Sequence, residues 1–143
     1  MKIIPFEQKY RDDTIFMILE AKDALGRVPG LNEDLLDIQK NYLDKGDMFW
    51  IAIDENDRVI GSIGYNSLND EEVVLHRLFV KYNLKNQGIG TALLQTAEEH
   101  IRSLNKKNII VHLGNKKQFF ESWRFYPKHG YVEFKPSYMH KSL

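Results

Sequence analysis

The residues best suited to chemistry lie where an apolar strand meets a helix, near the middle of the chain. The segment Leu78 to Val80 is apolar, a loop rich in lysine and asparagine follows, and Gly-Ile-Gly-Thr at residues 88–91 then opens an amphipathic helix. Backbone N–H groups in the first turn of a helix have no partner within the helix, and the dipole adds about half a positive charge there. This junction therefore predicts an anion site, with phosphate as the expected ligand.

Two common nucleotide-binding motifs do not fit this junction. A P-loop requires Lys directly after its last glycine, whereas Thr91 follows Gly90. A dinucleotide-binding fingerprint requires a small residue where Leu93 stands and an acidic residue about 20 positions further on, near Asn108. A dinucleotide-dependent oxidoreductase is therefore the weakest functional interpretation of the glycines.

The elements around the junction predict one domain over residues 1–143. Three consecutive apolar strands joined by short loops predict an antiparallel meander that leads into the glycine turn. The expected fold is α/β (α+β), with a central mixed, mostly antiparallel sheet of about six to seven strands flanked by about four helices. The expected strands are residues 2–6, 48–53, 58–65, 72–80, 108–113, 131–134 and 138–141, and the expected helices are 12–22, 32–46, 88–104 and 118–128.

Composition narrows the function classes. The 143 residues include 20 Lys and Arg against 20 Asp and Glu, so no overall basic field indicates a nucleic acid or membrane partner. Cysteine is absent, which excludes disulfides and thiolate nucleophiles, and the five histidines show no His-x3-His spacing, so no metal is expected. The first residues lack the apolar core of a signal peptide, and no apolar run approaches ~20 residues. We therefore expect a cytoplasmic location.

Several motifs in order along the chain resemble the GNAT superfamily of N-acetyltransferases. The run from Leu78 to Leu94 is similar to its acetyl-coenzyme A signature, Arg/Gln-x-x-Gly-x-Gly/Ala after an apolar strand, with Lys85 in the Arg/Gln position. Lysine keeps the charge but lacks the fork geometry of arginine. The segment Phe125 to Tyr131 resembles the second signature, Phe-Tyr-x-x-x-Gly-Phe. The hairpin at residues 49–63 and the final strand are also similar to those of the family.

The resemblance implies acetyl-CoA as the acyl donor and no metal. Backbone amides from Asn86 to Thr91 would hold the pyrophosphate, and the Val80 N–H would polarise the thioester carbonyl. The family places an asparagine where Phe119 stands here, so the earlier Asn115 either contacts the coenzyme or caps a helix. The implied coenzyme-binding residues are Leu78, Phe79, Val80, Lys85, Asn86, Gln87, Gly88, Ile89, Gly90, Thr91 and Asn115.

The catalytic candidates are one tyrosine and two residues of the strand 72–80. The resemblance implies that Tyr126 protonates the departing sulfur of the coenzyme. His76 has an ordinary pKa near ~6.5 and suits a general base, although a hydrogen-bonded core histidine is the slightly favoured interpretation of this residue. Glu72 would act through water. Strict alternation along the strand predicts that Glu72 and His76 share one face with Leu78 and Val80, while Arg77 lies on the other face as a salt-bridging or substrate-contacting residue.

The implied activity is acetyl transfer to a primary amine of a small molecule or peptide, by direct attack in a ternary complex. The acceptor region of the family corresponds to about residues 25–36, where Glu33, Asp34 and the neighbouring Asp37 favour a cationic amine, although acids in a first helical turn also complement the dipole. A coenzyme A sensor without turnover and a non-catalytic interaction domain are the alternative functions, and a homodimer is left open.

Overall fold

A computed structural model describes residues 1–27 and 29–143; Val28, within the expected acceptor region, lies outside the described residues. Seven strands form one sheet in the order β1-β2-β3-β4-β5-β7-β6. Neighbours in the sheet are antiparallel except β4 and β5, which are parallel. The predicted mixed, mostly antiparallel sheet is therefore confirmed. The strands are β1 (Lys2–Pro5), β2 (Met48–Ile53), β3 (Val59–Ser67), β4 (Glu72–Val80), β5 (Asn108–His112), β6 (Val132–Lys135) and β7 (Tyr138–Ser142).

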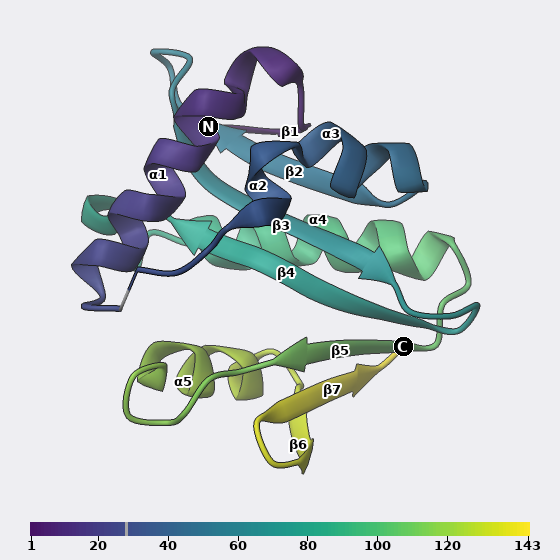
Figure 1. Ribbon diagram of the computed structural model, residues 1–143. Helices are drawn as coiled ribbons and strands as arrows, with labels where there is room; N and C mark the ends of the chain where they lie inside the picture. Colours follow the sequence, from purple (N-terminus) through teal and green to yellow (C-terminus); the bar gives the residue numbers. More distant parts are fainter. Residues whose placement is uncertain (28) are drawn as a thin grey trace.

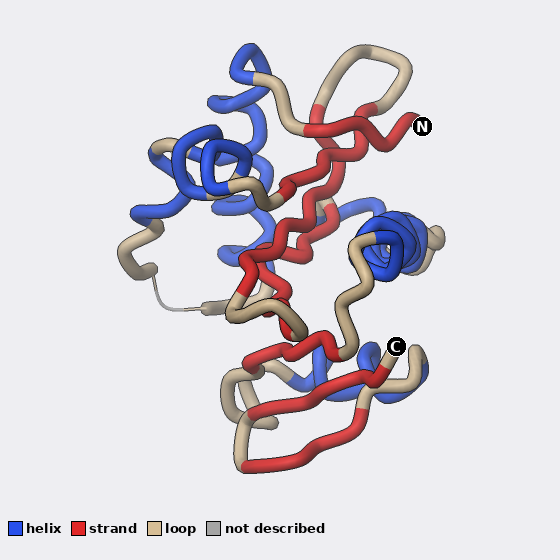
Figure 2. Tube along the Cα trace, turned by 90° about the vertical axis from the view of Figure 1, so that its right-hand side faces the viewer, coloured by secondary structure: helices blue, strands red, loops and turns tan. Residues whose placement is uncertain are grey.

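Helices cover both faces of the sheet. The first three helices lie on one face and the last two on the other, which the two views in Figures 1 and 2 show together. Short 3-10 turns precede α1, β2 and α4. The α-helices within the described ranges are α1 (Arg11–Ala24), α2 (Glu33–Leu36), α3 (Ile38–Asn41), α4 (Ile89–Ser103) and α5 (Phe120–Lys128), and the 3-10 turns are η1 (Gln8–Tyr10), η2 (Leu43–Lys45) and η3 (Tyr82–Leu84).

The single helix predicted for residues 32–46 is wrong, because Asp37 divides it. This residue has φ −144° and ψ 79°, and its carboxylate accepts a hydrogen bond of 3.0 Å from the Lys40 N–H. Aspartate competes with helical backbone bonding in this way and favours the start of a new helix. The segment therefore forms α2, α3 and η2, and Asp34 of α2 is bonded to Arg77 of β4.

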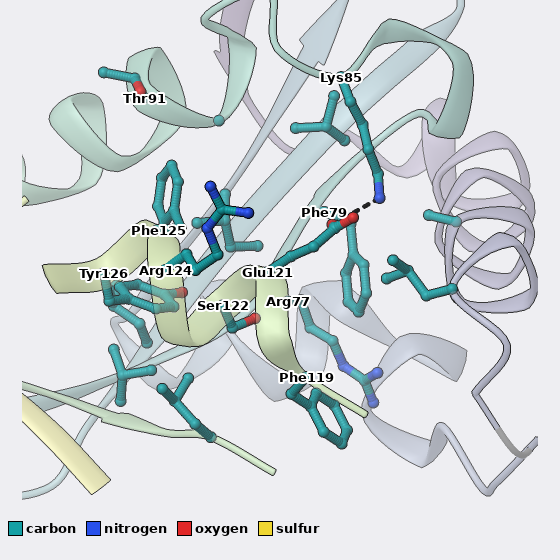
Figure 3. Close-up of a pocket in the computed structure, with 18 of the residues that line it drawn as sticks. Arg77, Phe79, Lys85, Thr91, Phe119, Glu121, Ser122, Arg124, Phe125 and Tyr126 are labelled. Carbon is teal, nitrogen blue, oxygen red and sulfur yellow. Dashed lines mark hydrogen bonds and ion pairs between the residues drawn. The ribbon is translucent and has the colours of Figure 1, made fainter. Parts of the chain in front are cut away.

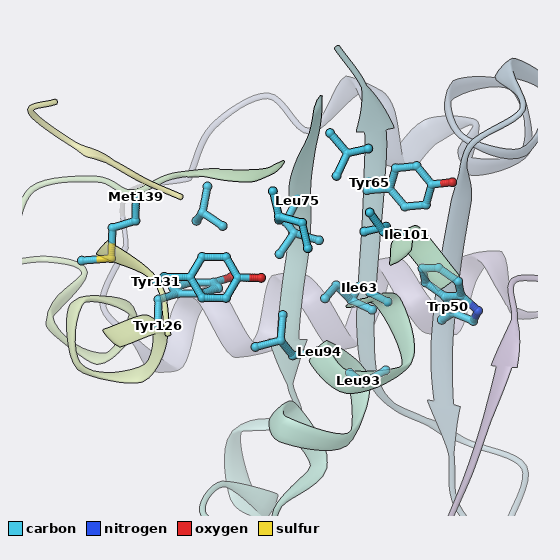
Figure 4. Packing of buried hydrophobic residues seen from close by; sticks show 14 of the residues in the cluster. Trp50, Ile63, Tyr65, Leu75, Leu93, Leu94, Ile101, Tyr126, Tyr131 and Met139 are labelled. Carbon is cyan, nitrogen blue, oxygen red and sulfur yellow. The ribbon is translucent and has the colours of Figure 1, made fainter. Parts of the chain in front are cut away.

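The larger core lies between the sheet and the helices α4 and α5 (Figure 4). Ile89, Leu93, Ala97 and Ile101 repeat every four residues along α4 and are all buried. The helix approaches β3 closely, since a Cβ atom on Gly61 would lie 2.8 Å from the Leu93 side chain. This contact fixes α4, and with it the glycine turn, against the sheet.

A β-bulge interrupts β4 at Arg77. This residue has φ +58°, the register with β3 shifts between Ser62 and Gly64, and the Ser62 hydroxyl donates to the Arg77 carbonyl at 2.7 Å. Leu78 and Val80 consequently pack on the same core as the residues at 73 and 75.

The predicted strict alternation along the whole strand is therefore wrong. The extra residue reverses the faces beyond it, so His76 does not share a face with Leu78 and Val80.

Candidate active site

A cleft opens where β4 and β5 stop pairing. The two strands are bonded only over Glu72–Val74 with Asn108–Ile110, and beyond this region they diverge (Figure 1). The cleft has a volume of about 710 Å³ and is lined by the second half of β4, the start of α4, the end of β5 and one side of α5. A parallel pair that separates in this way leaves backbone groups on its inner edges without strand partners.

The glycine turn supplies free amides at one end of this cleft. Gly88 precedes α4 with φ +83°, it has no side chain to cap the helix, and the first helical turn carries no acid. The first hydrogen bond of the helix runs from Ala92 N–H to the Gly88 carbonyl at 3.0 Å, so the amides of residues 89–91 precede it. Residues 88–91 line the cleft, whereas Gln87 is exposed outside the lining. The turn thus has the geometry of an anion site.

Two side chains expected to assist at this turn have partners on α5 or directly after it. Lys85 Nζ lies 2.7 Å from Glu121 Oε2 across the cleft (Figure 3), and Thr91 Oγ1 lies 3.4 Å from His129 Nε2. His129 also stacks on Phe125, with ring centroids 4.5 Å apart. Sequence analysis missed Glu121 and His129, because they are 36 and 38 residues from their partners and no local spacing marks them.

The main chain of β4 directs one N–H into the cleft. Lys81 N–H donates to the Ile60 carbonyl at 2.9 Å, and Val80 stands opposite Gly61 in the same register. Bonded and non-bonded positions alternate along an antiparallel pair, so the N–H of Val80 points away from β3. It faces the side where the pairing with β5 has ended, and no strand occupies that side.

Tyr126 lies on α5 at the wall of the cleft. Its side chain is buried among Phe125 and Tyr131, with ring centroids 5.3 and 5.2 Å away, and it lines the cleft together with Val80 and Gly90. Burial raises the pKa of Tyr126 well above its ordinary value. The phenol therefore stays protonated at neutral pH and can donate a hydrogen bond, while the raised pKa makes it a weaker acid than an exposed tyrosine.

The two residues predicted as bases lie in different places. His76 is exposed to the cleft and its ring stands edge-on to Tyr42 at 6.4 Å. The surrounding protein atoms, and secondarily the charge of Arg77, lower the pKa of His76, so the ring is neutral at pH 7.

Glu72 is not brought to the cleft. It begins β4, roughly 25 Å along the strand from Val80. Its carboxylate accepts hydrogen bonds of 3.0 Å from Asn69 and Asn108, which lower the pKa of Glu72. Asn115 also lies outside the lining. Its Oδ1 accepts a hydrogen bond of 2.8 Å from the Gln118 N–H within the turn before α5, whose own N-cap is Phe119, so Asn115 caps this turn and not the helix.

Arg77 forms an ion-pair network that ties the bulge to α2. Its guanidinium meets Asp34 with two hydrogen bonds, Nε to Oδ2 at 3.0 Å and Nη2 to Oδ1 at 2.5 Å, and the Tyr42 hydroxyl donates to Oδ2 at 2.7 Å. Although burial opposes it, the bonds from Arg77 and Tyr42 hold the pKa of Asp34 below its ordinary value. Arg77 is therefore a salt-bridging residue, one of the two roles that the sequence left open.

The described ranges contain no group of three or more histidine and carboxylate side chains arranged to hold a metal ion. No helix in the described parts of the chain is both long and apolar enough to cross a bilayer.

Comparison with known proteins gives consistent findings. The model of the acetyltransferase (GNAT) family matches residues 14–131. Human N-acetyltransferase 8 is 32% identical over 87 residues, covering 57% of this chain and 38% of the relative. A probable N-acetyltransferase camello of Xenopus tropicalis is 28% identical over 118 residues, covering 78% of this chain and 52% of the relative. The chain thus spans only about 38 to 52% of the length of these curated relatives.

Solved structures match over nearly the whole chain. A GNAT-family acetyltransferase of Staphylococcus aureus Mu50 superposes with a TM-score of 0.90 at 26% identity, covering 99% of this chain and 98% of the other. The PaiA N-acetyltransferase of Thermoplasma acidophilum, solved with coenzyme A, superposes with a TM-score of 0.76 at 18% identity, covering 100% of both chains. The second likeness shows the fold alone.

Proposed function

The chain belongs to the acetyltransferase (GNAT) family, and we propose that it moves the acetyl group of acetyl-CoA to a primary amine of a small molecule or peptide. The observation that carries this proposal is the single cleft that joins the free amides of residues 88–91, the inward N–H of Val80 and the buried Tyr126. These groups correspond to the phosphate end, the carbonyl and the sulfur of an acyl-CoA.

Binding would begin at the glycine turn. The amides at the start of α4 and the positive end of its dipole favour a diphosphate, and no acid in the first turn opposes it. The pantetheine arm would lie along β4, using the edge that β5 leaves open. The coenzyme supplies an activated acetyl group as a thioester.

Transfer needs three further groups from this chain. The amine nitrogen attacks the thioester carbonyl carbon, and the Val80 N–H stabilises the oxygen as negative charge develops on it. The carbon–sulfur bond breaks, and Tyr126 gives its proton, or a hydrogen bond, to the departing sulfur. His76, directly or through water, takes the proton that the amine nitrogen loses. Because the chain contains no cysteine, the acetyl group is not carried on a cysteine of the protein, and the amine attacks the thioester directly.

The test is release of coenzyme A thiol by the purified protein over a panel of primary amines. Amine-dependent release supports the proposal. Stabilisation of the protein by acetyl-CoA without release from any amine would overturn it in favour of a coenzyme A sensor, and no thermal stabilisation at all would indicate an interaction domain.

A tyrosine substitution tests the assignment of the acid. Tyr126→Phe should lower kcat by about 10²-fold and leave the affinity for acetyl-CoA near wild type, because only the proton donor is removed. Tyr138→Phe on β7, outside the cleft lining, is the matched control and should change neither quantity. Unchanged turnover of Tyr126→Phe would remove this residue from the mechanism.

A further inference from the structure

A second, smaller cavity adjoins the cleft on the side of α1. It has a volume of about 330 Å³ and is lined by Lys22, Arg27, Arg77, Phe79, Gln118 and Phe119. Arg27, Arg77, Phe79 and Phe119 line the cleft as well, so the two spaces adjoin at the β4 bulge. Figure 3 shows Phe79, Arg77 and Phe119 together at this end of the cleft.

The charges around this cavity do not cancel. Its lining includes three cationic side chains and no acid among the described residues. Arg77 is neutralised by its two hydrogen bonds to Asp34. The Lys22 ammonium donates to the uncharged Oδ1 of Asn32 at 3.0 Å, and Arg27 lies against aromatic rings. Two positive charges therefore remain without a carboxylate partner in the described structure.

Arg27 is held in place before any ligand binds. Its guanidinium carbon lies 4.1 Å from the ring centroid of Phe119 and 5.8 Å from that of Phe79. The Phe119 ring is itself fixed over Gly114, where a Cβ atom would come within 2.1 Å of it. The Nε of Arg27 is buried without a hydrogen-bond partner among the described residues. A ligand oxygen is the kind of group that satisfies such a donor.

The acids that the sequence placed in the acceptor region have other roles. Asp34 is bound by Arg77 and Tyr42, Asp37 caps α3, and Glu33 is exposed and lines neither space. Burial lowers the pKa of both Lys22 and Arg27, and the charges of Arg77 and Arg27 lower that of Lys22 further, while the carboxylates of Asp34 and Glu121 partly offset these effects at Lys22 and Arg27, respectively. The lining of the cavity, with three cations and no acid among the described residues, is electropositive, and the three acids that favoured a cationic amine do not line it.

We infer that the acceptor amine also carries an anionic oxygen group, a carboxylate or a phosphate, which binds between Arg27 and Lys22 while the amino group lies in the cleft near Val80. This inference rests on the proposed function and names its substrate class. An amino acid, or a phosphorylated amine of similar size, has both groups within a few bonds and suits the small cavity. Arginine binds carboxylates and phosphates with a planar pair of donors, which gives orientation as well as affinity.

Binding of product analogues tests this inference independently of turnover. The probes are N-acetyl-L-methionine and N-acetyl-L-glutamate, their fully amidated and uncharged derivatives, and the unacetylated amine O-phosphoethanolamine, titrated by calorimetry into protein loaded with coenzyme A. We expect the acids, or O-phosphoethanolamine, to bind at least 10-fold more tightly than the uncharged amides. A preference for the acids assigns a carboxylate, and binding of O-phosphoethanolamine alone assigns a phosphate.

Substitutions of the two cationic residues test whether the preference for acids over amides depends on this cavity. Arg27→Gln, and separately Lys22→Gln, should each reduce the ratio of acid to amide affinity by about 10-fold, with melting curves reporting that the variants are folded. Arg102→Gln on the exposed face of α4 is the matched control and should retain the full ratio. Equal binding of acids and amides, binding of no probe, or a preference that survives both substitutions would overturn the inference.

Thiol release measured in parallel separates the two proposals. Turnover of amines without any dependence on Arg27 would overturn the anionic substrate class and leave the acetyltransferase activity standing. A preference for acids that depends on Arg27, with no release from any amine, would overturn the catalytic proposal and retain the binding site.

Discussion

The two ends of β4 have the same strand geometry and opposite surroundings. At its first end, Glu72–Val74 pairs with β5, Val73 is fully buried, and the Glu72 carboxylate is bonded by two asparagines. At its second end, beyond the bulge, β5 is absent and the N–H of Val80 faces a cleft of about 710 Å³. The comparison shows that the candidate active site forms where the pairing of β4 with β5 ends.

The bulge at Arg77 separates these two ends. A non-glycine residue at φ +58° is unfavourable by itself, on the order of 1 kcal/mol. The hydrogen bond from Ser62 and the paired bonds to Asp34 hold it in place. One inserted residue thus turns Leu78 and Val80 toward α4 and leaves the backbone edge open, while the first half of β4 keeps its core contacts.

The substitution with the largest expected effect removes the backbone N–H group of Val80, at the second end of β4, where β5 no longer pairs. Val80→Pro should lower kcat by about 10²- to 10³-fold, because the donor to the developing oxyanion is lost. The fold should persist, since this N–H is not bonded to β3. Val80→Ala retains the N–H and is the control in steady-state kinetics. Equal activities of the two folded variants would contradict the role of the main chain.

A pair of substitutions compares the titratable group that lies beside the bulge in the cleft, His76, with the one at the paired end of β4, Glu72. His76→Gln should lower kcat/KM by about 10²-fold, whereas Glu72→Gln should leave it unchanged. Since desolvation lowers the pKa of His76, activity of the wild type should fall only as pH drops below about 6.5, when the ring becomes charged.

A pH–rate profile checks this expectation, and His76→Gln should lack that acid limb. The hydrogen bonds that lower the pKa of Glu72 stabilise the fold above its unfolded pKa and are lost as pH falls through the folded value. Loss of activity in Glu72→Gln at neutral pH would instead place the general base at the first end of β4, which pairs with β5.

Two glycines with the same backbone angle separate binding from strain. Gly88 has φ +83° and Gly46 has φ +84°, and a Cβ atom on either would meet nothing within 4 Å. Alanine at each should cost about 1 kcal/mol of unfolding free energy, because both positions are left-handed. Only Gly88→Ala should also weaken the binding of acetyl-CoA, with a Kd about 10-fold higher, since the added methyl group lies at the glycine turn. Equal acetyl-CoA affinities by calorimetry would contradict an anion site there.

The smallest expected effect concerns the ion pair across the cleft. Lys85 and Glu121 are partly exposed, so their interaction is worth about 0.5 kcal/mol. Glu121→Gln should free Lys85 for a phosphate and raise the acetyl-CoA affinity about 2-fold, with the gain decreasing at high salt. Glu71→Gln, which breaks the exposed pair with Lys107 at the closed end, is the control. Weaker binding by Glu121→Gln would show that Glu121 itself contributes to the site.

Most of the secondary structure and the glycine turn could be predicted from the sequence alone. Alternating and helical patterns are local, and so are the chemical requirements of a glycine turn, so the seven strands, α4 and residues 88–91 could be predicted. The segment around Asp37 was not predicted correctly, because its side chain competes with the helix at one residue.

Which side chains meet at the site follows from the folded structure and could not be predicted from the sequence. The bulge at Arg77, the pairing of Lys85 with Glu121 and the positive cavity at Arg27 each join residues far apart in the chain. Glu72 was predicted as a general base, but it lies at the end of β4 that is remote from the cleft. The physical reason is that secondary structure follows from neighbouring residues, whereas charge balance, burial and strand separation depend on contacts that no local pattern encodes.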